Sequence, residues 1–247
     1  MRIFSAFKVY KIFYANLADL SLNYYLYISM KRIIIICFAL LLNACGQSPA
    51  KPEQAPAQKP VQKTTIKKDI FVAIQPMQGP GKELCELLAK QIELFYGFKA
   101  EIMEETNLPE YAWYAARNRY RADRLLNHLL RVKPLKYDYI IGITEKDISC
   151  TKDAYADWGV FGLGFMPGAS CVVSTFRLKR NMRSEEHFRE RVIKVVLHEL
   201  GHNIGLPHCP TKGCMMQDAN GTIKSVDEEK IEVCDLCKEK IKKFKEK

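Results

Sequence analysis

The sequence has little net charge beyond its first 68 residues. The whole chain of 247 residues carries a formal net charge of +10. Residues 1–68 contain ten basic and two acidic residues, which leaves 28 basic and 26 acidic residues, a net charge of +2, for residues 69–247. Nucleic-acid-binding proteins present a basic face with interleaved aromatic side chains, and no such pattern occurs here. We therefore expect no nucleic-acid partner.

Near the N-terminus the sequence has an apolar run, residues 33–42, that is too short to span a bilayer, which needs about 20 residues. Lys31 and Arg32 precede the run, and a small residue followed by Cys45 ends it. This is the pattern of a secretory signal, and the ending LNAC resembles a bacterial lipobox. We predict a lipoprotein signal peptide over residues 30–45 and a lipid anchor at Cys45. The alternatives are an ordinary signal cut near Ala44 and a short buried strand.

This signal defines four segments of the chain. A signal begins at the start of a protein, so Met30 is interpreted as the true initiator and residues 1–29 as an upstream extension. Residues 46–68 are rich in Pro, Gln, Ala and Lys and cannot bury enough apolar surface to fold, which predicts a flexible tether. Residues 69–247 form the predicted globular domain. We expect it to be exported and membrane-anchored, on the periplasmic or cell-surface side.

Within residues 69–247 the predicted strands and helices alternate, and the sequence has no internal repeat. Strands are predicted over 70–76, 98–103, 137–144, 160–166 and 171–176, and amphipathic helices over 82–96, 119–131 and 185–204. The stretch RVIKVVL is rich in β-branched residues, but the residues that follow it make sense only on a helix, which starts at Ser184 as the N-cap. The pattern predicts a mixed α/β domain with one twisted sheet.

The chain has only five histidines, and three of them lie in the stretch HELGHNIGLPHC. His198 and His202, four residues apart on a helix, share one face. Gly205 can adopt the left-handed conformation that ends a helix, which returns His208 to the same side. Three imidazoles leave one position open for water or substrate, which is typical of a catalytic zinc. Glu199 is placed to act as the general base toward a water molecule.

Four further cysteines have a spacing that is typical of a second metal site. Cys209, Cys214, Cys234 and Cys237 form two pairs of ligands suited to a structural zinc. An exported protein meets oxidising surroundings, which favour disulfides. The open alternative is that Cys209 is bridged to Cys214 and Cys234 to Cys237.

At these residues the sequence resembles the archaemetzincin family of metallopeptidases, whose signature is HExxHxxGxxHCx4CxMx17CxxC. Every fixed position from His198 to Cys237 is filled. The resemblance implies two Zn²⁺ per chain, one catalytic and one structural, with Met216 in the methionine turn beneath the catalytic metal. It also implies a metzincin-like zincin fold, with a twisted mixed sheet, an active-site helix and a C-terminal zinc-bound subdomain. A peptide or protein substrate would pair with the edge strand, for which we suggest residues 160–166.

The predicted function is therefore a zinc metallopeptidase that hydrolyses peptide bonds. The alternative is a catalytically silent, zinc-stabilised module that binds peptides or proteins on the same fold. His128 and His187 are interpreted as surface residues. Four aromatic residues are predicted either to line the substrate cleft or to pack in the core: Tyr111, Trp113, Tyr114 and Tyr120. The three remaining cysteines are expected to be buried as small apolar side chains: Cys85, Cys150 and Cys171.

Overall fold

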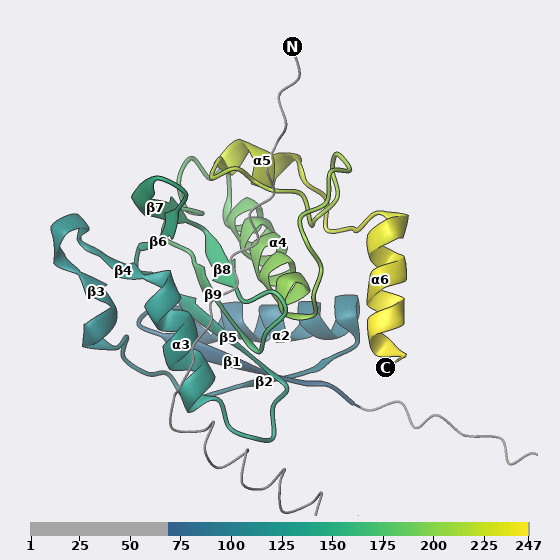
Figure 1. Ribbon diagram of the computed structural model, residues 1–247, viewed down its shortest axis with the longest axis horizontal. Coiled ribbons are helices and arrows are strands. Elements are labelled where there is room, and N and C mark those ends of the chain that lie inside the picture. The colour runs from purple at the N-terminus through teal and green to yellow at the C-terminus, as the bar shows by residue number, and fades with distance from the viewer. Residues whose placement is uncertain (1–68, 247) are drawn as a thin grey trace, which may run out of the picture. The chain divides into compact units, whose positions relative to one another are not determined.

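The computed structural model describes residues 69–246 (Figure 1). The upstream extension, the signal peptide with Cys45, and the tether all lie outside the described residues and stay predictions. Within residues 69–246, no helix combines the length and the apolar character that crossing a membrane requires.

The main sheet has five strands in the order β2-β1-β5-β9-β8. The first four are parallel, and β8 pairs antiparallel with β9, with Leu163 opposite Val172. The predicted strand over 160–166 is therefore shorter than expected, because Val160 belongs to another sheet and only three residues form the edge strand β8. The strands are β1 (Phe71–Met77), β2 (Lys99–Ile102), β5 (Tyr139–Thr144), β8 (Gly162–Gly164) and β9 (Ser170–Ser174).

A second, four-stranded sheet corrects the prediction of a single sheet. Its order is β3-β4-β6-β7, and its strands are short and largely only partly buried or exposed, apart from the buried first half of β6. The helix predicted from Arg119 begins at Ala122, because the three residues before it pair in β4 instead. The strands are β3 (Trp113–Tyr114), β4 (Arg119–Arg121), β6 (Ile148–Lys152) and β7 (Tyr155–Val160). One 3₁₀ turn, η1 (Glu110–Ala112), precedes β3, and another, η2 (Ala115–Arg117), connects β3 to β4.

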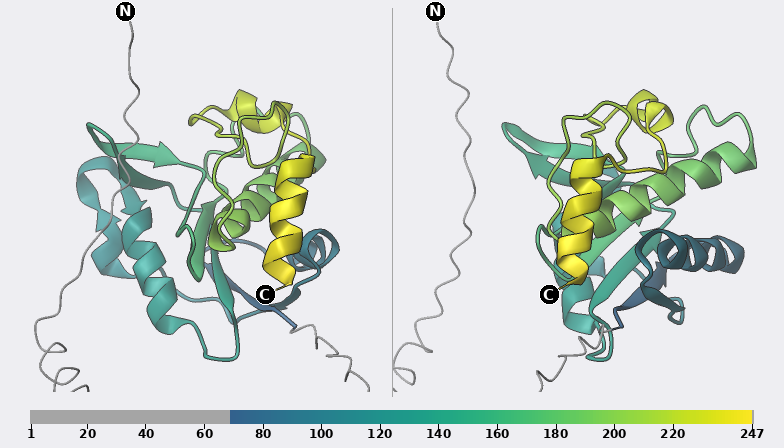
Figure 2. Two further views of the ribbon diagram at one scale, coloured as in Figure 1. Left: turned by 45° about the vertical axis from the view of Figure 1, so that its right-hand side comes forward. Right: turned by 90° about the vertical axis from the view of Figure 1, so that its right-hand side faces the viewer.

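Helices cover both faces of the main sheet (Figures 1 and 2). Alternate residues of β1 point to opposite faces: Val72 and Ile74 pack with α2 and α4, and Ala73 packs with α3. Helices α5 and α6 follow α4 in the chain. Cys237 and Ile241 of α6 pack in the same hydrophobic core as α2 and α4. The helices are α2 (Lys82–Tyr96), α3 (Ala122–Val132), α4 (Glu185–Asn203), α5 (Ile223–Glu228) and α6 (Asp235–Lys245).

Helix α4 forms as predicted, and its burial explains why β-branched residues are tolerated in it. The Ser184 hydroxyl accepts a hydrogen bond from the His187 backbone N–H at 3.1 Å, which is the expected N-cap. Val192 and Leu197 are fully buried and Val196 is 1% exposed. Tertiary packing on nearly all sides outweighs the modest helix propensity of valine and isoleucine.

A buried arginine joins α4 to α5. Arg191, 2% exposed, donates from Nε and Nη2 to the two carboxylate oxygens of Asp227 at 2.7 and 2.8 Å. His187 Nε2 donates to the same carboxylate at 2.9 Å, while its Nδ1 accepts from the Arg183 backbone N–H. His187 is 9% exposed, so the interpretation of it as a surface residue was wrong. The hydrogen bonds from Arg191 lower the pKa of Asp227 to about 2.

We expect the Asp227→Asn substitution to lower the free energy of unfolding by about 3 kcal/mol, because it leaves a buried guanidinium without its carboxylate. The pKa of Asp227 is lower in the folded than in the unfolded chain. The ionised carboxylate therefore stabilises the folded protein fully above pH about 4, and this stabilisation is lost as the pH falls toward 2. Urea unfolding followed by circular dichroism at several pH values checks this.

The matched control is Asp153→Asn, at an exposed turn residue whose φ of 49° asparagine readily adopts. Its effect should be below about 0.5 kcal/mol. Equal unfolding free energies for the two variants at neutral pH contradict the role assigned to the Arg191–Asp227 pair.

Candidate active site and metal centre

The three histidines of the motif converge at the C-terminal end of α4. His198 and His202 project from the last turns of the helix, and His208 comes from the segment after it. One ring nitrogen from each histidine lies within 4.8 Å of the others. The His198 ring lies 4.6 Å from that of His202 and 5.4 Å from that of His208. The structure thus brings together the three predicted ligands.

Backbone carbonyls orient two of the rings. His198 Nδ1 donates to the Met215 carbonyl and His202 Nδ1 donates to the Leu206 carbonyl, each at 2.7 Å. These bonds hold the proton on Nδ1, so Nε2 keeps its lone pair for a metal. Burial, followed by the neighbouring His202, lowers the pKa of His198 to about 3, and burial also lowers the pKa of His202. Both rings are therefore neutral, as metal ligands must be.

Two glycines shape the chain around these rings. Gly205 has a φ of +92°, as predicted for the turn after the helix, and the Leu206 N–H donates back to the Gly201 carbonyl at 2.9 Å. A Cβ built on Gly201 would lie 2.5 Å from the sulfur of Met216. The missing side chain at Gly201 therefore lets the fully buried Met216 pack directly against α4.

Glu199 lies beside the three rings and is 7% exposed. Strand β8 covers it so closely that a Cβ on Gly162 would lie 2.6 Å from Glu199 Oε1. Burial raises the pKa of this carboxyl to about 8. A cation bound at the neighbouring histidines would oppose this shift and favour the ionised carboxylate, which is the form that accepts a proton.

The histidines and Glu199 open into a cleft of about 390 Å³ between α4, β7, β8 and the segment that ends in α5. None of the four aromatic residues suggested for the cleft lines it. Tyr111 and Trp113 are 49% and 38% exposed, so they do not pack in the core either. The cleft walls instead contain residues that sequence reasoning did not single out: Trp158, Phe161, Asp218, Val226 and Glu229.

The structure also places His128 and the three cysteines outside the C-terminal cluster. His128 is half-buried and makes a 2.9 Å hydrogen bond with the Tyr111 hydroxyl, away from the cleft. Cys85 and Cys171 are fully buried and Cys150 is 8% exposed, as expected for small apolar side chains. Cys150 also contributes to the cleft wall, which nothing in its sequence context indicated.

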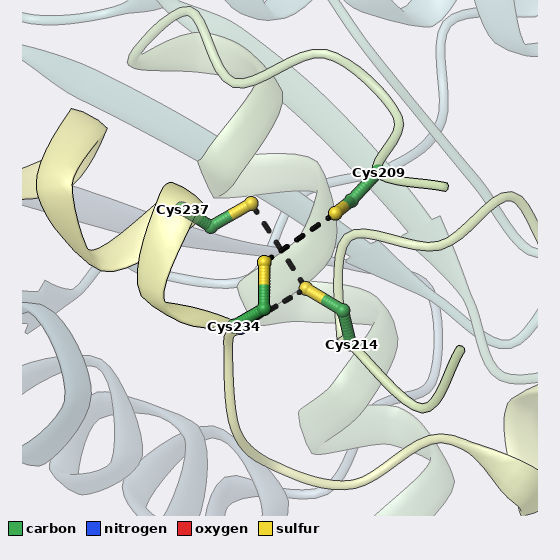
Figure 3. Close-up of side chains that lie close together, drawn as sticks. All are labelled: Cys209, Cys214, Cys234 and Cys237. Atoms are coloured by element: carbon green, nitrogen blue, oxygen red, sulfur yellow. Dashed lines mark hydrogen bonds between the residues drawn. The ribbon is translucent and has the colours of Figure 1, made fainter. Parts of the chain in front are cut away.

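The four C-terminal cysteines form a second cluster, in which all four side chains point toward one centre (Figure 3). Cys209 Sγ lies 3.5 Å from Cys234 Sγ, and Cys214 Sγ lies 3.9 Å from Cys237 Sγ. Sulfurs around a tetrahedral zinc at 2.3 Å are about 3.8 Å apart, whereas a disulfide is about 2.05 Å long. The arrangement therefore suits a four-thiolate metal site, and the seven cysteines of the described residues are all free.

Three converging imidazoles beside a buried carboxyl, with a cleft on their free side, match the arrangement that is typical of the catalytic zinc site of a metallopeptidase. Sequence comparison agrees with this class. The profile of peptidase family M54 matches residues 75–243. An archaemetzincin from Halobacterium salinarum is 34% identical over 149 residues, covering 58% of this chain and 82% of its own length.

The fold has solved counterparts. The crystal structure of archaemetzincin from Methanopyrus kandleri superposes with a TM-score of 0.63 at 27% identity, covering 72% of this chain and 97% of that one. Archaemetzincin from Archaeoglobus fulgidus, complexed with malonate, gives a TM-score of 0.60 at 29% identity, covering 69% and 99%. The chain described here belongs to peptidase family M54, and its expected mixed α/β fold is confirmed.

Proposed function

We propose that this chain hydrolyses peptide bonds with a zinc ion held by His198, His202 and His208, and with Glu199 as the general base. The observation that carries the proposal is the convergence of three ring nitrogens within 4.8 Å beside a carboxyl that is 7% exposed. Charged side chains are rarely buried without a partner or a chemical role.

Each residue has a distinct task in this proposal. The three histidines would hold a zinc ion that, when bound, would supply Lewis acidity toward the scissile carbonyl and lower the pKa of water from 15.7 to roughly 7. Glu199 accepts a proton from the attacking water and returns it to the departing amine. The Met215 and Leu206 carbonyls keep the His198 and His202 rings in the tautomer that can bind the metal.

The substrate is a peptide or protein, and we propose that it binds as an extended strand along β8. Residues 161–164 line the cleft beside Glu199, and β8 is an edge strand of the main sheet. An edge strand offers unpaired backbone groups to an extended peptide. Asn203 fixes the position of this edge, because its side-chain amide donates to the carbonyls of Phe165 and Ser170 at 3.0 and 2.9 Å.

A second zinc ion is proposed for Cys209, Cys214, Cys234 and Cys237. This site is closed by four thiolates, so its role is structural. It would join the segment after α4 to the first turn of α6, because Cys234 is the N-cap of that helix.

The Glu199→Gln protein should keep its zinc and lose about 10²- to 10⁴-fold in kcat/KM, because an amide cannot accept the proton from water. Hydrolysis of a fluorogenic peptide library together with metal analysis measures both quantities. Glu186→Gln is the control, since that side chain lies in the first turn of the same helix, is exposed and does not line the cleft. Wild-type activity in Glu199→Gln rejects the assigned role, and a zinc-loaded wild-type protein that cleaves nothing supports the silent binding module.

The count of two metal ions has its own test. Residues 69–247 purified without chelators should contain two zinc ions per chain, and the His202→Ala variant should contain one. A single ion that is lost in His202→Ala would instead mean that the cysteines hold no metal. Elemental analysis against protein concentration gives the stoichiometry, and thiol titration of the denatured chain counts reduced cysteines.

We also propose that the chain is an exported lipoprotein anchored at Cys45, which rests on the sequence of residues 30–68 alone. Mass spectrometry of the N-terminal peptide from the mature protein should find Cys45 as the first residue, carrying acyl chains. An N-terminus within residues 2–29, or an unmodified Cys45, is incompatible with this prediction.

A further inference from the structure

A buried carboxyl in the cleft has no place in the mechanism above. Glu229 follows directly after α5, is 7% exposed and lines the same cleft as the three histidines. Its Oε1 has no hydrogen-bond partner within residues 69–246. A buried carboxylate oxygen without a partner is unfavourable by several kcal/mol, so this side chain is suited to a partner that enters the cleft.

The cation whose charge acts on Glu229 already has other partners. Lys194, whose side chain is 3% exposed, donates to the Val226 carbonyl at 3.2 Å and pairs with Glu190 at 2.7 Å. Burial raises the pKa of Glu229 to about 7 although Lys194 acts in the opposite direction, and Asp218 adds to the rise. The protein therefore does not fully compensate the charge of this carboxyl.

The other charges of the cleft also favour a cation. Glu199, Asp218 and Glu229 line it, and Lys152 is the single lysine or arginine among the described residues that do so. The Lys152 ammonium lies 5.6 Å from the centre of the Trp158 ring, a cation–π contact. With the histidines assigned to zinc and Glu199 to proton transfer, Asp218 and Glu229 are the two acidic residues of the cleft that remain available to bind a substrate side chain.

The cleft that Glu229 lines also has apolar residues in its walls. Val195 of α4 and Val226 of α5 line the cleft and are 6% and 1% exposed. Lysine and arginine combine a hydrocarbon stem with a terminal charge, so they bury the stem against apolar surface and place the charge at a polar group. A cleft that combines apolar side chains with the buried carboxyl of Glu229 suits such a side chain.

We propose that Glu229 determines substrate specificity by binding the cationic side chain of a lysine or arginine residue next to the scissile bond. This inference rests on the proposed peptidase function, because it assigns the substrate class of that same cleft. Glu229 is a specificity residue and takes no part in the proton transfer, which belongs to Glu199.

The test compares peptides that are identical except at one position. Fluorogenic peptides carry lysine, arginine, norleucine or glutamate at each of two positions on either side of the cleaved bond. We expect kcat/KM for lysine or arginine at one of these positions to exceed that for norleucine by about tenfold or more, the ratio that corresponds to about 1.4 kcal/mol. In Glu229→Gln this preference should disappear while the norleucine peptide is cleaved as before.

Two further variants separate recognition from structure. Glu229→Lys should prefer the glutamate peptide, which a purely structural effect cannot produce. Glu228→Gln is the matched control, because Glu228 is adjacent in sequence, pairs with Lys224 at 3.7 Å, has a side chain that is 58% exposed and does not line the cleft. It should keep the wild-type preference. An equal loss of kcat/KM for all peptides in Glu229→Gln would show a structural role and overturn the proposal.

Binding to the Glu199→Gln protein separates the two proposals. Fluorescence anisotropy should give a dissociation constant about tenfold lower for the lysine peptide than for the norleucine peptide, and the double variant Glu199→Gln/Glu229→Gln should bind both equally. If wild type cleaves peptides but shows no basic preference in either assay, the specificity proposal fails and the peptidase function stands. If wild type cleaves nothing but the binding preference is present, the peptidase function fails and the recognition site stands.

Discussion

The geometry of the site depends on two hydrogen bonds from histidine rings to backbone carbonyls. The acceptors, the carbonyls of Met215 and Leu206, lie in the segment that follows α4. The two bonds therefore hold the orientation of the histidine rings and also attach this segment to the helix. The Cys209 N–H donates to the Met216 carbonyl at 2.7 Å and closes this segment into a loop. Met216 can lie under the helix only because Gly201 has no side chain.

The histidine cluster and the cysteine cluster, which we propose as the two metal sites, share this loop. His208 and Cys209 are consecutive, so a cysteine held in the thiolate cluster limits where the neighbouring imidazole can lie. His208 is the most exposed of the three histidines, with a side chain that is 50% exposed, and its Nδ1 lies 3.7 Å from Asp218. The buried Cys209 next to it therefore ties an otherwise exposed part of the chain to the core.

The sequence predicts those parts of the fold and site that depend on local spacing. The positions of His198, His202 and Gly205, the N-cap at Ser184 and the four cysteines follow from helix periodicity and ligand chemistry. The second sheet was missed because its strands are short and partly exposed, without a clear alternation. Asp218 and Glu229 were missed because the loop after Met216 has no periodic pattern. His187 was misjudged because its partner Asp227 is 40 residues away.

The segment after Met216 both anchors α5 to α4 and contributes to the cleft wall. Asp227 is held by Arg191 and His187 of α4, and the Val226 carbonyl accepts from Lys194. Val226 and Glu229 form part of the cleft wall. Arg191 and Lys194 precede His198 on the same helix, so α4 carries the histidines and Glu199 of the proposed active site and also holds α5, which forms part of the cleft wall. Substitutions at Asp218 and Glu229 would therefore change the cleft wall without removing the hydrogen bonds that hold α5 to α4.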